Sequence, residues 1–63
     1  MDFFICQGSM RKLIDILSMI EEMNIKTYGV SIDKIMGKYK LYVMISKADL
    51  LKIRDAVAIK EDF

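Results

Sequence analysis

The chain has 63 residues, a net charge of +1, 54% hydrophobic residues, one cysteine and no histidine. A single cysteine excludes an intrachain disulfide, and the lack of histidine argues against a zinc site. A net charge of +1 gives no strong electrostatic attraction to nucleic acid or anionic lipid. A domain of this size buries only about 60% of the surface that its unfolded form exposes. We therefore expect a single domain, residues 1–63, that gains further buried area from a partner chain.

The apolar segments are too short to span a membrane, and none of them has the features of a signal peptide. The longest uncharged apolar runs cover residues 3–6 and 41–45, whereas a spanning helix needs roughly 20 residues. Asp2 stands where the basic region of a signal peptide belongs, and no apolar signal segment follows. We expect a cytoplasmic protein, in which one reduced cysteine is ordinary.

The first half of the chain predicts a strand and a helix. Residues 2–6 are aromatic and β-branched, which is typical of a strand, and residues 7–9 form a turn with Ser9 as the helix N-cap. A helix is predicted over residues 10–23, and Asn24 is its expected stop. The apolar stripe of this helix is wide and comprises Met10, Leu13, Ile14, Leu17 and Ile20, flanked by Ile16, Met19 and Met23.

The second half predicts a hairpin and a second helix. Strands are expected over residues 25–32 and 39–45. They are joined by a short turn around Met36-Gly37 within the segment 33–38, in which Gly37 can supply a positive φ. The second helix starts at Ser46, where Ser46-Lys47-Ala48-Asp49 is a variant of the capping box. Its stripe is Leu50, Leu51, Ile53, Val57 and Ala58, and residues 60–63 are expected to fray.

The element order β-α-β-β-α predicts an α+β two-layer sandwich, ferredoxin-like but without the last strand. Right-handed crossover places both helices on one face of a three-stranded antiparallel sheet. The helix-covered face is expected to hold Tyr28, Val30, Ile32, Leu41, Val43 and Ile45. The register of the first strand stays open, because residues 3–6 do not alternate in polarity.

The opposite face of the sheet is predicted to be apolar and to form an interface. Tyr42 and Met44 point to this face, together with either Phe4 and Cys6 or, in the other register, Phe3 and Ile5. We take Phe4, Cys6, Tyr42 and Met44 as the candidate interface. An exposed apolar patch usually marks a contact surface, and a two-fold homodimer is the commonest assembly. Isolated apolar residues on a surface are the alternative.

A small-molecule site is the second hypothesis. Gly8 and Ser9 precede the first helix, whose backbone N–H groups can bind an anion, although ordinary capping explains the same residues. Arg54 lies within the apolar stripe of the second helix. Its guanidinium either binds a carboxylate of a ligand or partner through two hydrogen bonds or pairs with an acidic side chain. In the second case its aliphatic part packs at the edge of the apolar stripe.

Single-stranded nucleic acid is the third hypothesis. Lys38, Tyr39 and Lys40 begin the third strand, and Tyr42 follows. Aromatic rings beside lysines can stack unpaired bases. The pattern resembles in part the aromatic strand of single-strand RNA binders but lacks their second aromatic strand motif. Lysines on a hairpin also protect a sheet edge from aggregation, and the low net charge disfavours nucleic acid as the partner.

The element order and the strand start Gly37-Lys38-Tyr39-Lys40-Leu41 resemble ferredoxin-like regulatory modules, including those that bind amino acids at dimer interfaces. The resemblance implies an effector-binding module at a subunit interface. It also leaves a sheet edge open, because the final strand is missing.

The residues do not favour catalysis. Cys6 has no histidine to act as its base, and there are no paired carboxylates, phosphate loop or metal-ligand cluster. We expect no enzyme, no cofactor and no metal. The leading hypothesis is a small homo-oligomeric binding protein: an adaptor, inhibitor or regulatory subunit, of a kind that a phage or mobile element can encode.

Overall fold

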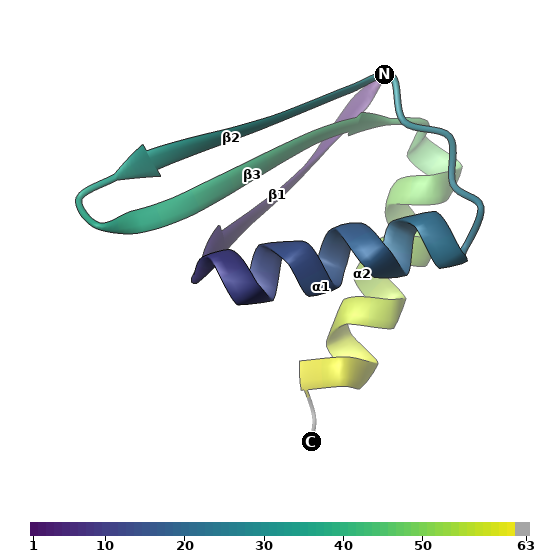
Figure 1. Cartoon of the computed structure of the whole chain (residues 1–63). Helices are drawn as coiled ribbons and strands as arrows, with labels where there is room; N and C mark the ends of the chain where they lie inside the picture. Colours follow the sequence, from purple (N-terminus) through teal and green to yellow (C-terminus); the bar gives the residue numbers. More distant parts are fainter. Residues whose placement is uncertain (62–63) are drawn as a thin grey trace.

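The computed structural model describes residues 1–61, and side chains as far as residue 58. The elements are β1 Asp2–Gly8, α1 Met10–Glu22, β2 Gly29–Ile35, β3 Lys38–Ile45 and α2 Lys47–Glu61 (Figure 1). The strands form one antiparallel sheet in the order β1-β3-β2, with both helices packed against it. The predicted fold class is confirmed. The last two residues of the stretch predicted to fray, 62 and 63, lie outside the described residues.

The register of β1 against β3 decides which side chains face the helices. Phe4 lies opposite Val43 and Cys6 opposite Leu41, and residues that are directly opposite share a face. Phe4 is only 7% exposed and Val43 is fully buried, so this is the helix-covered face. Among the described side chains, those buried in the core are all aliphatic or aromatic: Phe4, Leu13, Ile16, Ile20, Leu41, Val43, Ile45, Leu50 and Ile53.

Helix α1 begins and ends with side-chain and backbone caps. The Ser9 hydroxyl accepts a hydrogen bond from the Lys12 backbone N–H at 3.2 Å, as predicted. At the other end Asn24 adopts a left-handed φ of 56°. The Asn24 N–H donates to the Glu21 carbonyl at 3.0 Å and the Ile25 N–H to the Ile20 carbonyl at 3.3 Å, which is a Schellman motif.

Helix α2 begins at the predicted Ser46 cap. The Ser46 hydroxyl accepts from the Asp49 N–H at 3.3 Å and donates to the Asp49 carboxylate at 3.0 Å. Leu50 and Ile53 enter the core and Val57 packs against it, as the stripe predicts. Leu51 and Ala58 do not follow the prediction, because both side chains are exposed.

The hairpin differs from the prediction in its bounds. The strand predicted over residues 25–32 begins only at Gly29, because Ile25 closes the Schellman motif instead of pairing in the sheet. Most of the segment 33–38 belongs to the strands, and the turn lies at Met36 and Gly37, as predicted. Their φ angles of 53° and 80° are both positive, as a type I′ hairpin turn requires. Asp33 and Lys34 belong to the strand and lie opposite Lys40 and Tyr39.

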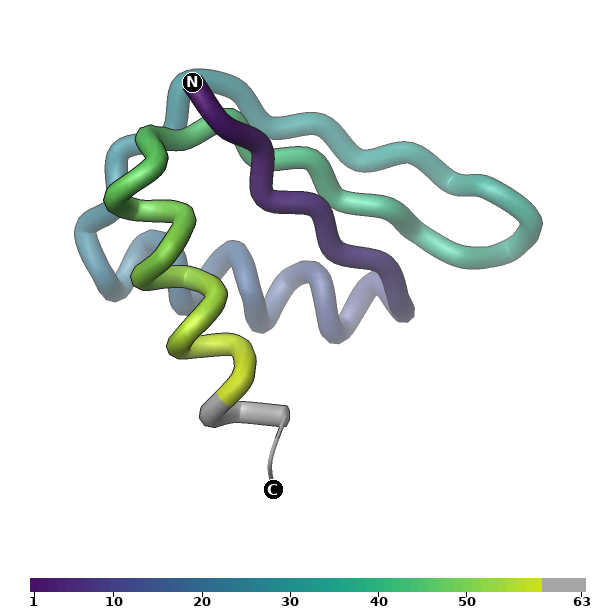
Figure 2. Tube along the Cα trace, turned by 180° about the vertical axis from the view of Figure 1, so that it is seen from behind, coloured from purple at the N-terminus to yellow at the C-terminus, as the bar shows by residue number. Residues whose placement is uncertain are grey.

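Strand β2 is exposed along its whole length. All seven of its residues are exposed, although Val30 and Ile32 share the helix-covered face with Val43 and Leu41. Val30 and Ile32 thus lie on the predicted face, but they and Tyr28 are exposed, so the helices do not cover them as expected. The helices pack mainly against β1 and β3, and the β2–β3 hairpin extends past the first turn of α1 in both views (Figures 1 and 2). The hairpin tip thus reaches beyond α1, and the rest of β2 is exposed because the helices pack against the neighbouring strands.

Candidate interaction surface

The face of the sheet away from the helices carries an apolar patch. We call Phe3, Ile5, Tyr42 and Met44 the outer patch. Phe3 lies opposite Met44 and Ile5 opposite Tyr42, so the four side chains form a compact square on two neighbouring strands. Phe3 and Ile5 are 50% and 53% exposed, and Tyr42 and Met44 are half-buried.

This placement corrects half of the candidate interface. Phe4 is a core residue and Cys6 is half-buried against the core, so neither lies on the outer face. Phe3 and Ile5 replace them, which is the other register that the sequence left open. The structure places Tyr42 and Met44 on the expected face. Nothing in the polarity of residues 3–6 distinguishes the two registers, since all four are apolar.

Small residues on β2 leave a hollow beside the outer patch. Gly29 lies opposite Met44 and Ser31 opposite Tyr42, so β2 presents little side-chain bulk at these two positions. A hollow of about 240 Å³ is lined there by Phe3, Gly29, Val30, Ser31, Tyr42 and Met44. The outer patch is thus a ridge of four large side chains beside a shallow depression, a shape that a second molecule can fit.

Charged side chains border the outer patch toward the hairpin turn. Asp33 lies opposite Lys40 on the same face, and the Lys40 ammonium lies 5.5 Å from the centroid of the Tyr42 ring. Such a cation–π contact at an exposed site contributes about 0.5–1 kcal/mol. The rim therefore carries both signs of charge next to an apolar centre, as protein interfaces commonly do.

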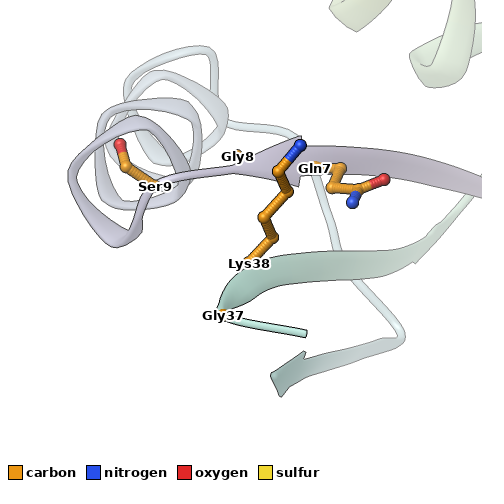
Figure 3. Close-up of a pocket in the computed structure, with 5 residues that line it drawn as sticks. All are labelled: Gln7, Gly8, Ser9, Gly37 and Lys38. Atoms are coloured by element: carbon orange, nitrogen blue, oxygen red, sulfur yellow. The ribbon is translucent and has the colours of Figure 1, made fainter. Parts of the chain in front are cut away.

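The candidate ligand residues separate into two places. Gly8 and Ser9 line a hollow of about 520 Å³ together with Gln7, Gly37 and Lys38. Figure 3 shows Lys38 reaching from the start of β3 toward the strand that carries Gln7 and Gly8. Arg54 is exposed on α2 and is not among the described residues that line this hollow.

The candidate nucleic-acid residues divide between the two faces of the sheet. Lys38 and Lys40 share the outer face with Tyr42, whereas Tyr39 packs against the core on the other face. The Lys34 ammonium lies 5.6 Å from the Tyr39 ring centroid, and Lys26 lies 5.1 Å from that of Tyr28. The surface that combines aromatic rings with lysines is therefore Phe3, Tyr42, Lys38 and Lys40, not the continuous run 38–40.

Sequence reasoning missed the exposed helix-side residues of β2. Seven to eight strand residues extend about 26 Å, whereas the 13 residues of α1 extend about 20 Å. This length difference concerns only the hairpin tip, because Val43 and Leu41, directly opposite Val30 and Ile32, are fully buried. The exposure of Val30 and Ile32 depends on which strands the helices pack against, and no sequence signal marked it.

Other kinds of site find no support in the described part of the chain. Within it, no group of three or more His, Cys, Asp or Glu side chains is placed to hold a metal ion, and no helix has the length and apolar character to cross a membrane. Cys6 is a free thiol. Compared with protein-family models, curated proteins and solved structures, the chain matches none of them.

Proposed function

We propose that the protein is a small non-enzymatic binding protein that assembles with a second copy of itself through the outer patch. It would serve as an adaptor, inhibitor or regulatory subunit. The observation that carries the proposal is the exposure of Phe3 and Ile5 beside Tyr42 and Met44, on the side of the sheet without helices. Contiguous apolar surface of this kind usually marks an interaction site.

The size of the sheet face limits how strong this contact can be. Three strands spaced about 4.8 Å apart and seven residues long give a flat face of about 340 Å². A standard interface buries about 800 Å² on each partner. Face-to-face packing of two sheets alone is therefore a small contact, which favours a reversible dimer over an obligate one.

The charges on the rim favour a two-fold arrangement. In an isologous contact each copy presents the same surface to the other, so a surface must be complementary to itself. The outer face carries Asp33 as well as Lys38 and Lys40. A two-fold axis near Tyr42 lets the acid of one copy approach the lysines of the other, while the apolar centres meet.

The test replaces an outer-patch residue with a charge. Ile5→Glu is expected to raise the dissociation constant of the dimer at least tenfold in sedimentation equilibrium, because it buries a carboxylate in an apolar contact. Leu51→Glu is the matched control, since Leu51 is 56% exposed on the opposite side of the molecule. Unchanged assembly of the Ile5→Glu variant, with the control also unchanged, would refute the outer patch as the contact.

A small-molecule effector site is the second candidate function, supported by the hollow at Gly8 and Ser9. A carboxylate there would meet the Lys38 ammonium and the start of α1. A thermal-shift screen with amino acids and nucleotides tests this candidate, and Lys38→Ala should abolish any shift. Lys47→Ala, at an exposed lysine outside the hollow, is the control.

A further inference from the structure

Strand β2 leaves one edge of the sheet without a neighbouring strand. Within residues 1–61, β2 pairs only with β3, and it lies at the edge of the sheet in Figure 1. All of its residues, Gly29–Ile35, are exposed. An edge strand presents a row of backbone N–H and C=O groups with which another strand can pair, and proteins ordinarily shield such a row. The outer edge of β2 is therefore open to a further strand.

The hairpin turn determines which residues direct their backbone groups to this edge. In a two-residue turn the flanking residues, here Ile35 and Lys38, form a hydrogen-bonded pair. Such pairs recur at every second residue of an antiparallel ladder. Counted back from Ile35, the residues between the hydrogen-bonded pairs are Lys34, Ile32 and Val30. The N–H and C=O groups of these three residues therefore point away from β3, toward the open edge.

A hydrogen bond at the start of β2 agrees with this alternation. The Tyr28 N–H donates to the Met44 carbonyl at 2.8 Å, so the Met44 carbonyl points to β2. Met44 lies opposite Gly29, and Gly29 belongs to the same alternating series as Ile35. The two ends of the strand thus give the same alternation of inward and outward backbone groups.

The placement of the helices leaves room for a second copy at this edge. Two copies that pair antiparallel along β2 form one continuous sheet, and a two-fold axis perpendicular to the sheet keeps the helices of both copies on the same side. Helices α1 and α2 pack mainly against β1 and β3, so the two β2 strands separate the helices of one copy from those of the other. The opposite edge lacks this clearance, because α2 packs against β1.

The side chains of β2 favour one antiparallel register. With the two-fold axis at Ser31, Val30 of each copy lies opposite Ile32 of the other. The branched apolar side chains of both copies then form one row on the helix side of the sheet, where Val30 and Ile32 point. An axis at Asp33 would place two carboxylates opposite each other, which is destabilising, and an axis at Ile32 would place Lys34 opposite Val30.

We infer that a second copy of the chain pairs antiparallel with the open edge of β2, with the two-fold axis at Ser31. In this register Val30 and Ile32 exchange backbone hydrogen bonds with Ile32 and Val30 of the other copy, because these are the residues whose backbone groups point outward. The contact is independent of the proposed function, which uses the outer patch. The two contacts are compatible, since the joined sheet doubles the flat outer face to about 680 Å², close to the roughly 800 Å² of a standard interface.

The test is disulfide trapping at the axis. The two Ser31 residues form a pair without mutual backbone hydrogen bonds, with Cα atoms about 4.5 Å apart, a separation that a disulfide spans. Ser31→Cys, in a chain that also carries Cys6→Ala and Ile5→Glu, is expected to form a covalent dimer under copper phenanthroline oxidation, measured on non-reducing gels. Ile5→Glu removes the outer-patch contact, so failure of this inference and failure of the proposed function are distinguishable.

A second serine gives the matched control. Ser18 is also exposed but lies on α1, so Ser18→Cys in the same background reports collisions alone. The Ser31→Cys chain is expected to cross-link about tenfold faster than the Ser18→Cys chain, because only its thiols are held together. Equal rates, or no covalent dimer of the Ser31→Cys chain, would overturn the inference. Faster cross-linking of Ile32→Cys than of Ser31→Cys would place the axis at Ile32 and would overturn it as well.

Charge substitutions test whether strand pairing causes the cross-link. Val30→Glu with Ile32→Glu, added to the Ser31→Cys chain, places carboxylates opposite each other and should lower the rate to that of the Ser18→Cys chain. Ile35→Glu is the control on the same strand, because Ile35 is exposed and lies beyond the paired residues; it should change the rate less than about twofold. Circular dichroism checks that the variants are folded, and Ile32→Glu alone replaces the double variant if that one is not. An unchanged rate in the folded variant would refute pairing along β2.

Discussion

Val43 and Val30 are the same residue type, lie directly opposite each other on neighbouring strands, and point to the same face of the sheet. Val43 is fully buried and Val30 is half exposed. The difference arises from position alone, because α1 and α2 pack over β1 and β3 and stop short of β2. An alternating strand pattern thus reports which way a side chain points, but not whether anything covers it. The sheet has a covered half, which holds the fold, and one strand that stays exposed.

The largest effect is expected from the two neighbouring phenylalanines of β1. Phe4→Ala should lower the free energy of unfolding by about 3–4 kcal/mol, since it leaves a cavity in the core, whereas Phe3→Ala should cost less than about 1 kcal/mol. Urea unfolding at a protein concentration that keeps the chain monomeric measures both. Similar losses for the two variants would contradict the register of β1.

The two opposed valines test the comparison directly. Val43→Ala should cost about 2 kcal/mol, from lost burial of two methyl groups and the resulting cavity. Val30→Ala should cost less than about 0.5 kcal/mol in the monomer. Thermal unfolding followed by circular dichroism measures both. A cost at Val30 as large as that at Val43 would mean that β2 is covered in the isolated chain.

The cap of α2 affects the covered half, because this helix packs against β1. Ser46→Ala removes both hydrogen bonds to Asp49 and should lower stability by about 1 kcal/mol. Ser31→Ala on the exposed β2 strand is the control and should change stability by less than about 0.5 kcal/mol. Chemical denaturation of the pair checks this, and an equal loss in both variants would contradict the role of the cap.

The smallest effect is expected at the hairpin turn, and it is stabilising. Met36 adopts a positive φ that a long apolar side chain disfavours. Met36→Asn gives the Asn-Gly pair that type I′ turns prefer and should raise stability by about 0.5 kcal/mol. Met1→Asn at the chain start is the control, and a decrease in melting temperature for Met36→Asn would contradict the turn geometry.

The sequence was sufficient for the parts of the fold that depend on local chemistry. The caps at Ser9 and Ser46 and the stop at Asn24 follow from side chains that satisfy nearby backbone groups, and the structure confirms all three. The β-α-β-β-α order and the handed crossover then determine the layers. These elements need no information from distant residues.

The other features of the fold depend on contacts between segments, and no single segment of the sequence reveals these contacts. Residues 3–6 are all apolar, so only pairing with β3 shows that Phe4 faces inward and Phe3 outward. The bounds of β2 depended on Ile25, whose N–H is taken by the Ile20 carbonyl. The exposure of Val30 and Ile32 depended on which strands the helices pack against, which is a property of the assembled layers.

The turn that joins β2 to β3 also carries a methionine whose thioether is open to oxidation. The Met36 side chain is 97% exposed, while the methionines at 10, 19, 23 and 44 are half-buried. Thioether oxidation to the sulfoxide follows access to solvent. An oxidant therefore modifies the hairpin tip before it reaches the thioethers inside, and the added polar oxygen projects into water where it breaks no packing. Among the described residues only Met1, at 70% exposed, offers a comparably accessible thioether.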